Sequence, residues 1–292
     1  MSTEKNPKKL KKQLSLINVY AIATGTTLSA GFFLLPGIAA AQVGPAITLA
    51  YIIAAIPLIP AMCSMMELAT AMPKAGGAYY FLDRSMGPLV GTIGGLGTWL
   101  SLMLKTAFAL IGVGAYLDIF FPSISVTLFA VSFALLFGII NLIGSKETGS
   151  MQVFLVGSIL ILLGGFVVNG VFEVDMSHFD GYLDAGSHAL FSTAGLVYIS
   201  YVGVTKVASV AEEVKNPERN LPLGMFLAFG TAMVIYCLGT FIMVGTIPME
   251  ELRVSLTPVA LAAENILGFK GKVFVTIAAI FAFFSVANAG IL

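Results

Sequence analysis

The chain has 292 residues, of which 58% are apolar and 10% are charged, and its formal net charge at pH 7 is zero. Soluble domains have about 45–50% apolar and about 25% charged residues, and a soluble protein of this size needs far more polar surface than this composition supplies. The composition therefore excludes a soluble enzyme, a nucleic-acid-binding protein and a disordered chain, and it predicts a protein with several membrane spans.

The first segment, residues 1–15, is polar and basic. Its five lysines are Lys5, Lys8, Lys9, Lys11 and Lys12. A signal peptide also begins with a basic stretch, but the apolar run that follows here is too long for one, and further apolar runs come after it. We therefore expect a basic tail on the cytoplasmic side that leads into a retained first span.

Eight stretches are long and apolar enough to cross the hydrocarbon core of a bilayer, which takes about 20 residues in a helix. They are Leu16–Ala41, Ala46–Met66, Pro88–Leu117, Ser125–Ile143, Met151–Val171, Ala189–Val210, Leu223–Gly245 and Val273–Leu292. Each is too continuous for a strand of a membrane barrel, and helices satisfy their own backbone groups in lipid. The sequence thus predicts an all-α polytopic membrane protein, with a surface helix over Thr257–Leu267 before the last span.

The lysine and arginine residues predict the orientation. With the N-terminus inside, ten cations fall on cytoplasmic segments: Lys5, Lys8, Lys9, Lys11, Lys12, Lys74, Arg84, Lys146, Lys215 and Arg219. The outer segments hold Arg253, Lys270 and Lys272. Because short cytoplasmic loops carry an excess of lysine and arginine, we expect a multi-pass protein of the cell (plasma) membrane with its N-terminus in the cytoplasm.

Two spans carry small residues at places where a continuous helix would be weak. The first contains Gly25–Gly37 (GTTLSAGFFLLPG), and the sixth contains Tyr198–Thr205 with Gly203 near its middle. Glycine costs a helix interior about 1 kcal/mol relative to alanine, but small residues also let helices pack closely, so a packing face and an unwound segment both fit. A pair of interrupted spans in corresponding places is typical of transporter binding sites. We predict breaks over residues 26–31 and 199–204 that face each other near mid-membrane.

The interrupted spans stand first and sixth in the chain, which predicts two inverted repeats of five helices. Residues 16–171 would form the first repeat (spans 1–5), residues 172–188 an outer loop, and residues 189–292 an incomplete second repeat (spans 6–8). The last apolar run reaches the final residue without a polar flank. We therefore expect the sequence to be a C-terminally truncated piece of a protein with two more spans.

Three stretches resemble the amino acid–polyamine–organocation (APC) superfamily of permeases, of the amino acid permease type. They are Gly25–Gly37, Pro73–Tyr80 (PKAGGAYY) and Tyr201–Pro222, which ends in EEVKNPERNLP. The resemblance implies a LeuT-type five-plus-five inverted repeat, of which eight spans are present here. It also implies a secondary transporter that moves amino acids by alternating access, as a proton-coupled symporter or an exchanging antiporter, and without a cofactor.

The resemblance also implies a substrate site at the two breaks. In the superfamily the substrate carboxylate binds backbone N–H groups at the first break, which match Ser29–Gly31, and the ammonium binds carbonyl groups of the sixth span, which match residues 199–201. The full set of expected substrate-binding residues is Thr26, Ser29, Ala30, Gly31, Ile199, Ser200, Tyr201 and Gly203.

Two positions depart from the superfamily pattern. Ser29 stands where members often have a glycine, which affects the expected geometry of the first break. Thr205 stands where many members have an acidic residue that is linked to protons or to a cationic substrate. We therefore expect a small or neutral amino acid as the substrate, rather than arginine, lysine or a polyamine.

Two lysines fall inside predicted spans and are the candidates for proton coupling. Lys105 is the eighteenth of thirty residues in its span, and no acidic residue lies at a comparable depth. An ammonium at the bilayer centre costs about 2.5–3.5 kcal/mol. We therefore expect that Lys105 faces a wet cavity, pairs with a helix-end carbonyl as a structural support, binds and releases a proton, or stands where a sodium ion would sit. Lys206, nearer the cytoplasmic end of its span, either snorkels to the surface or takes part in coupling.

The remaining residues point to no catalytic or metal site. His178 and His188 lack the spacing of metal ligands, and no nucleotide-binding or nucleophile motif occurs. An intramembrane enzyme would need paired carboxylates, a metal cluster or a Ser/His pair at one depth, which the spans lack. A sensor that binds an amino acid without transporting it stays open as an alternative. The expected partners are a small-molecule substrate, H+ and the lipid bilayer, with no nucleic acid.

Overall fold

The computed structural model describes residues 12–74, 76–143 and 148–291, and within them every regular element is a helix. Six continuous helical stretches in these residues are long and apolar enough to cross a membrane. The prediction of an all-α polytopic membrane protein is therefore confirmed.

The described helices cover all eight predicted apolar stretches. In chain order the α-helices are α1 (Leu16–Thr27), α2 (Ala30–Phe33), α3 (Leu35–Val43), α4 (Ile47–Ala71), α5 (Gly77–Met86), α6 (Pro88–Asp118), α7 (Val126–Ile143), α8 (Thr148–Gly170), α9 (Gly186–Tyr198), α10 (Pro217–Thr246), α11 (Met249–Leu252) and α12 (Pro258–Ile291). The 3₁₀ helices are η1 (Gly44–Ala46), η2 (Val171–Glu173), η3 (Met176–Phe179) and η4 (Val202–Glu213).

Local sequence signals explain several helix boundaries. Pro88 begins α6, as predicted, because proline fits the first turn of a helix, where its missing N–H would have no partner. The surface helix expected over Thr257–Leu267 is the first part of α12, which bends at Gly268, where φ is 65°. Only glycine adopts such an angle without strain. Helix α5 lies outside every predicted span because it is short and carries Asp83 and Arg84.

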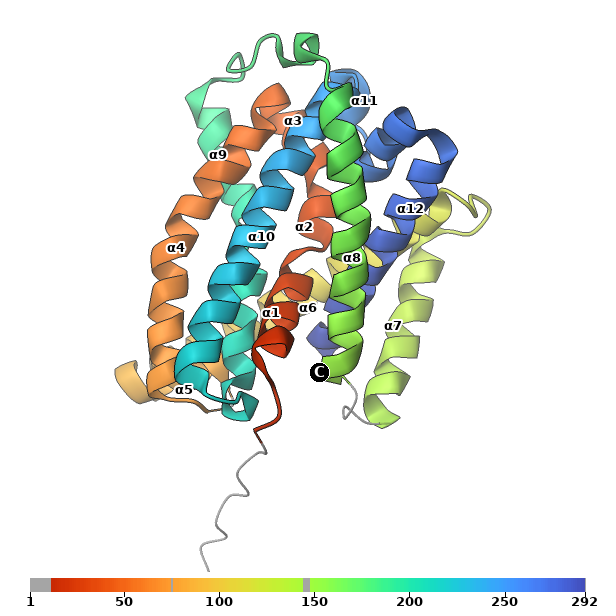
Figure 1. The fold of residues 1–292 in the computed structure, drawn as a ribbon. Coiled ribbons are helices and arrows are strands. Elements are labelled where there is room, and N and C mark those ends of the chain that lie inside the picture. Colours follow the sequence, from red (N-terminus) through yellow and green to blue (C-terminus); the bar gives the residue numbers. More distant parts are fainter. Residues whose placement is uncertain (1–11, 75, 144–147, 292) are drawn as a thin grey trace, which may run out of the picture.

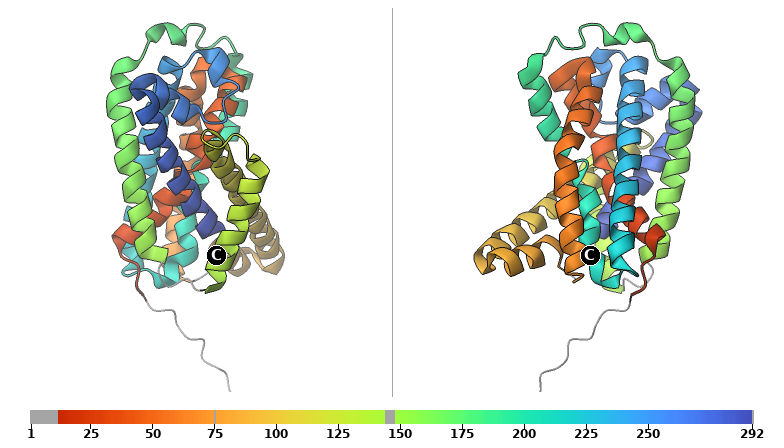
Figure 2. Two further views of the ribbon diagram at one scale, coloured as in Figure 1. Left: turned by 90° about the vertical axis from the view of Figure 1, so that its right-hand side faces the viewer. Right: turned by 60° about the vertical axis from the view of Figure 1, so that its left-hand side comes forward.

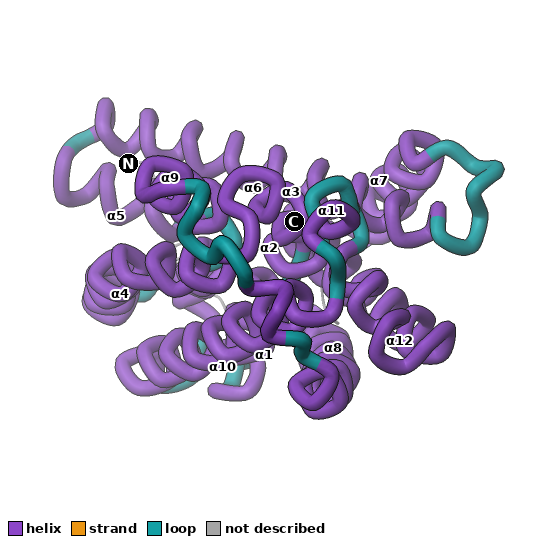
Figure 3. Tube along the Cα trace, turned by 90° about the horizontal axis from the view of Figure 1, so that it is seen from above, coloured by secondary structure: helices purple, strands orange, loops and turns teal. Residues whose placement is uncertain are grey.

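The helices form two packing groups (Figure 1, Figure 3). Helices α1, α4, α9, η4 and α10 pack mainly against one another, and α6, α7, α8 and α12 form the second group. Contacts of α1 with α8 and of α10 with α12 join the groups. In Figure 2, α5 and the start of α6 lean away from the rest of the bundle at one end.

The first predicted span lies in the interior of the bundle. Every residue from Ala23 to Ala30 is buried. A Cβ atom at Gly25 would lie 2.3 Å from Nε2 of Gln152 on α8 and 2.7 Å from Oγ of Ser285 on α12. The small residue thus lets three helices meet, which is the packing role of glycine in membrane proteins.

One end of the bundle holds the start of α1 beside the junction of η4 and α10. The backbone N–H groups of Gln13 and Leu14 donate to the carbonyl oxygen of Glu213 at 2.8 and 3.0 Å, and the N–H of Lys215 donates to that of Leu14 at 2.9 Å. Both segments therefore lie on the same side of the membrane, as the charge distribution predicts. The expected cations Lys5, Lys8, Lys9, Lys11 and Lys146 lie outside the described residues.

Candidate functional site

The first predicted span is interrupted between α1 and α2. Helix α1 ends at Thr27, α2 begins at Ala30, and Ser29 between them has φ −148° and ψ −136°, which is not helical. The hydroxyls of Thr26 and Thr27 each donate to a carbonyl one turn back along α1, at 2.7 and 2.6 Å. Such side-chain bonds compete with the helical backbone bonds. A break within the predicted range 26–31 is confirmed, but it is shorter than predicted: it comprises residues 28–29, whereas Thr27 still belongs to α1 and Gly31 to α2.

The sixth predicted span is interrupted as well. Helix α9 ends at Tyr198, residues 199–201 form a turn, and the chain continues as the 3₁₀ helix η4, which has 12 residues. Runs of 3₁₀ helix longer than about 3–4 residues are uncommon and often mark a hinge. The break predicted over residues 199–204 is confirmed, and it falls at the start of that range.

The two breaks touch each other. A Cβ atom at Gly31 would lie 2.5 Å from both Cβ and Oγ of Ser200, and a Cβ atom at Gly203 would lie 2.3 Å from the carbonyl oxygen of Thr26. Side chains do not approach this closely, so the contact requires both glycines. The one proton of the Thr26 hydroxyl is shared between the carbonyl oxygen of Ile22 and that of Gly203, which lies 2.9 Å away. The expectation that the breaks face each other is therefore confirmed.

A cavity of about 570 Å³ lies beside the breaks, a volume typical of small-molecule sites. The residues at and next to the breaks that line this cavity are Ser29, Ala30, Gly31, Ile199 and Ser200. The Ser29 hydroxyl is buried and has no hydrogen-bond partner among the described residues. The N–H groups of Ala30 and Gly31 lie in the first turn of α2, where a helix offers them no acceptor. The first break therefore holds a buried hydroxyl without a described partner and two backbone N–H groups for which the helix offers no acceptor, next to this cavity.

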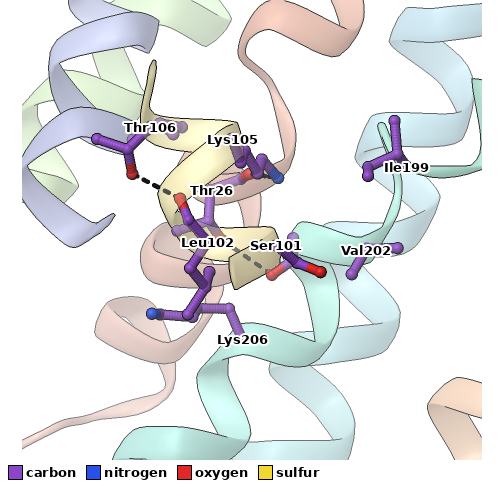
Figure 4. Close-up of a pocket in the computed structure, with 10 residues that line it drawn as sticks. Thr26, Ser101, Leu102, Lys105, Thr106, Ile199, Val202 and Lys206 are labelled. Carbon is purple, nitrogen blue, oxygen red and sulfur yellow. Dashed lines mark hydrogen bonds between the residues drawn. The ribbon is translucent and has the colours of Figure 1, made fainter. Parts of the chain in front are cut away.

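A smaller cavity of about 60 Å³, drawn in Figure 4, shares Ser101, Lys105 and Ile199 with the larger one. It is lined by Thr26, Ser101, Leu102, Lys105, Thr106, Ile199, Val202, Gly203, Lys206 and Val286. Lys105 lines both cavities, and its Nζ donates to the carbonyl oxygen of Thr26 at 2.7 Å. The ammonium thus sits at the C-terminal end of α1, where unpaired carbonyls and the helix dipole favour a cation.

A family model described as amino acid permease matches residues 14–292. The chain belongs to the amino acid permease family. The vacuolar cationic amino acid transporter 4 of Arabidopsis thaliana is 30% identical to this chain over 88% of this chain and 46% of the relative. The branched-chain amino acid permease BcaP of Bacillus subtilis is 27% identical over 88% of this chain and 60% of the relative. The inner membrane transport protein YbaT of Escherichia coli is 28% identical over 96% of this chain and 67% of the relative. The permease chain thus spans about half to two thirds of the length of these relatives.

The structure divides the predicted site residues of the permease between the two cavities. Ser29, Ala30, Gly31, Ile199 and Ser200 line the larger cavity, Thr26, Gly203 and Lys206 line the smaller one, and Ile199 and Lys105 are shared. The side chain of Tyr201 is fully buried and lines neither of these cavities. Its hydroxyl donates to the carbonyl oxygen of Tyr51 at 3.2 Å.

Three tyrosines of the permease hold backbone carbonyls at the first break. The hydroxyl of Tyr51 donates to Gly31 at 2.5 Å, and that of Tyr116 donates to Phe33 at 2.8 Å. The Tyr236 hydroxyl donates to Thr27 at 2.7 Å and also lies 3.2 Å from the carbonyl oxygen of Ser200.

These tyrosines are not predicted from the sequence. The available signal is a tyrosine inside an apolar span, because its hydroxyl needs a partner there. This signal does not identify the carbonyl group to which each tyrosine hydroxyl donates.

Removing the Tyr236 hydroxyl should weaken the link between the breaks. For Tyr236→Phe we expect about a tenfold loss of amino acid affinity, since a hydrogen bond contributes about 0.5–1.5 kcal/mol. Tyr20→Phe is the matched control, because its hydroxyl pairs with Thr231 on α10 and not with a break. Equilibrium binding to the purified permease measures both variants, and equal losses would contradict a specific role for Tyr236.

Proposed function

We propose that this permease is a secondary active transporter that moves amino acids across the cell membrane by alternating access, with its N-terminus in the cytoplasm. The contact between the two breaks, beside a cavity in which the Ser29 hydroxyl has no described partner, carries the proposal. Similar proteins are named as transporters of cationic or branched-chain amino acids. We assign no catalytic role to any residue, so the proposed function is transport and not an enzymatic reaction.

In the proposed complex the breaks bind the two charges that amino acids share. The substrate carboxylate accepts hydrogen bonds from the Ser29 hydroxyl and from the N–H groups of Ala30 and Gly31. The substrate ammonium donates to carbonyl oxygens of Ile199 and Ser200. Half-helix ends at mid-membrane suit such charges because their backbone groups lack helical partners.

Alternating access requires the broken helices to move together. The start of α1 and the end of η4 are joined by the parallel bridge between Leu14 and Val214, and further along by the bond from Thr26 to Gly203. We therefore propose that α1 and η4 move as one unit against α6, α8 and α12. The breaks in the first and sixth spans favour a five-plus-five inverted repeat, with residues 16–171 and 189–292 belonging to different repeats.

Lys105 is the proposed proton-coupling residue. Its ammonium holds the Thr26 carbonyl, and the Thr26 hydroxyl holds the Gly203 carbonyl, so a change of charge at Lys105 reaches both breaks through two hydrogen bonds. Lys206 on η4 lines the smaller cavity beside it and is the second candidate. No acidic side chain among the described residues lines either cavity at the breaks.

Proteoliposomes that contain the full-length protein test the proposal. An inward proton gradient should drive saturable uptake of radiolabelled neutral amino acids, and preloaded unlabelled amino acid should stimulate uptake if the protein exchanges substrates. Binding without uptake would indicate the sensor alternative. If none of the twenty amino acids binds or is taken up, the proposed function is wrong.

A further inference from the structure

The larger cavity has two chemically different sides. Beside the breaks it is lined by Ser29, Ser200 and Lys105. Away from the breaks it is lined by Leu35 and Ile38 of α3, Leu104, Phe108 and Ile111 of α6, and Leu196 of α9. This second set, which we call the apolar wall, contains aliphatic and aromatic side chains from three helices. Leu104 and Ile111 are 61% and 47% exposed, so the cavity opens along α6 to the outside of the described bundle.

We infer, on the basis of the proposed function, that the permease selects amino acids with large apolar side chains. An amino acid whose carboxylate and ammonium are held at the breaks extends its side chain toward the apolar wall. Each methylene group that is removed from water tightens binding by about fourfold. The cavity volume of about 570 Å³ leaves room for a leucine or phenylalanine side chain.

The charged groups around the cavity disfavour a cationic side chain. Lys105 is the charged residue that lines it, and Lys206 lies in the adjoining cavity. Both carry the same sign as the side chain of arginine or lysine, and no carboxylate among the described lining residues compensates them. A cationic substrate would therefore be desolvated without a partner.

An acidic or polar side chain is disfavoured for a different reason. The Lys105 ammonium is bound to the Thr26 carbonyl on the side of the breaks, away from the apolar wall. The Ser101 hydroxyl, which also lines the cavity, donates to the carbonyl of Gly97 at 2.8 Å. The apolar wall itself offers no hydrogen-bonding side chain, and an unpaired polar group costs binding free energy when it is buried.

A competition series with the purified permease tests the substrate class. Glycine, alanine, valine, leucine, phenylalanine, arginine and glutamate compete against radiolabelled leucine. We expect affinity to rise by about fourfold per methylene from alanine to leucine, and arginine and glutamate to bind about 100-fold more weakly than leucine. Arginine or glycine binding as tightly as leucine would overturn the substrate class and leave the proposed function intact. Failure of every amino acid to bind would overturn both.

A cavity-filling variant tests whether this cavity sets the preference. Ala107 lines it from an exposed position on α6, so Ala107→Leu should fit into the fold. We expect it to lower the affinity for leucine and phenylalanine by about tenfold, through overpacking of the bound complex, and to change that for alanine far less. Ala61→Leu on the exposed side of α4 is the matched control and should bind all three like the parent. An equal loss for alanine and leucine, or the same change in the control, would overturn the assignment.

Discussion

Gly31→Val should abolish amino acid binding, with a loss of about 100-fold or more. A Cβ atom at this position would lie 2.5 Å from Cβ and Oγ of Ser200 and 2.8 Å from its Cα. The backbone of Ser200 cannot turn away as a flexible side chain could, so the two breaks must separate. Valine also restricts its own side-chain rotation and stiffens the chain. Equilibrium binding of amino acids to the purified variant measures the loss.

Gly195→Val is the matched control for this substitution. Gly195 is exposed on α9, and a Cβ atom there would meet nothing within 4 Å, so the control should be expressed and should bind like the parent. A compensating pair provides a second measurement. Ser200→Gly removes the two closest atoms, and it should restore part of the binding that Gly31→Ala loses. Parent-level affinity in purified, folded Gly31→Val would show that the breaks do not bind the substrate.

Features with a local cause could be predicted from the sequence. The breaks are such features, because they fall among small and hydroxyl-bearing residues that weaken a helix on their own. Gly31 in α2 and Gly203 in η4 lie beside the breaks and not within them. The spans are another, since bilayer thickness sets a minimum length of apolar sequence. Helix α6 begins at Pro88 as predicted and ends at Asp118, one residue beyond the predicted end.

Features that depend on tertiary contacts could not be predicted. The Tyr236 hydroxyl meets the Thr27 carbonyl across 209 residues of chain, and no local pattern encodes that pairing. For Tyr201 the backbone position was predictable and the orientation of the side chain was not. Its backbone position at the break is readable from the sequence, but the packing of its ring against Tyr51 and Tyr236 turns the side chain away from both cavities.

Lys105 combines both cases. Its depth in an apolar span marks it as unusual from the sequence alone, which leaves a structural support and a proton site as alternatives. The 2.7 Å bond to the Thr26 carbonyl identifies the support. A support of this kind still carries a charge that it loses when it releases a proton, so the two roles are compatible and need separate measurements.

Lys105→Met should lower amino acid uptake by about 10- to 100-fold, because a hydrogen bond from a charged group contributes about 1.5–3 kcal/mol. Methionine keeps an unbranched side chain in the cavity but removes the ammonium, so the Thr26 carbonyl loses its donor. Through the bond from Thr26 to Gly203 the loss extends to the second break. Uptake into proteoliposomes, normalised to folded protein, measures the effect.

The pH profile of the surviving transport separates the two roles of Lys105. If the proton is the coupling ion, raising the external pH should slow uptake by the parent, because the inward proton gradient falls. Lys105→Met should then keep some amino acid exchange that no longer responds to the gradient. Lys206→Met is the second variant of the series, since it removes the other ammonium next to the breaks but leaves the bond from Lys105 to Thr26. If Lys105 acts only as a support, Lys105→Met should yield less folded protein with the parent's pH profile. In that case Lys206 becomes the candidate, and a flattened profile in Lys206→Met would identify it as the proton site.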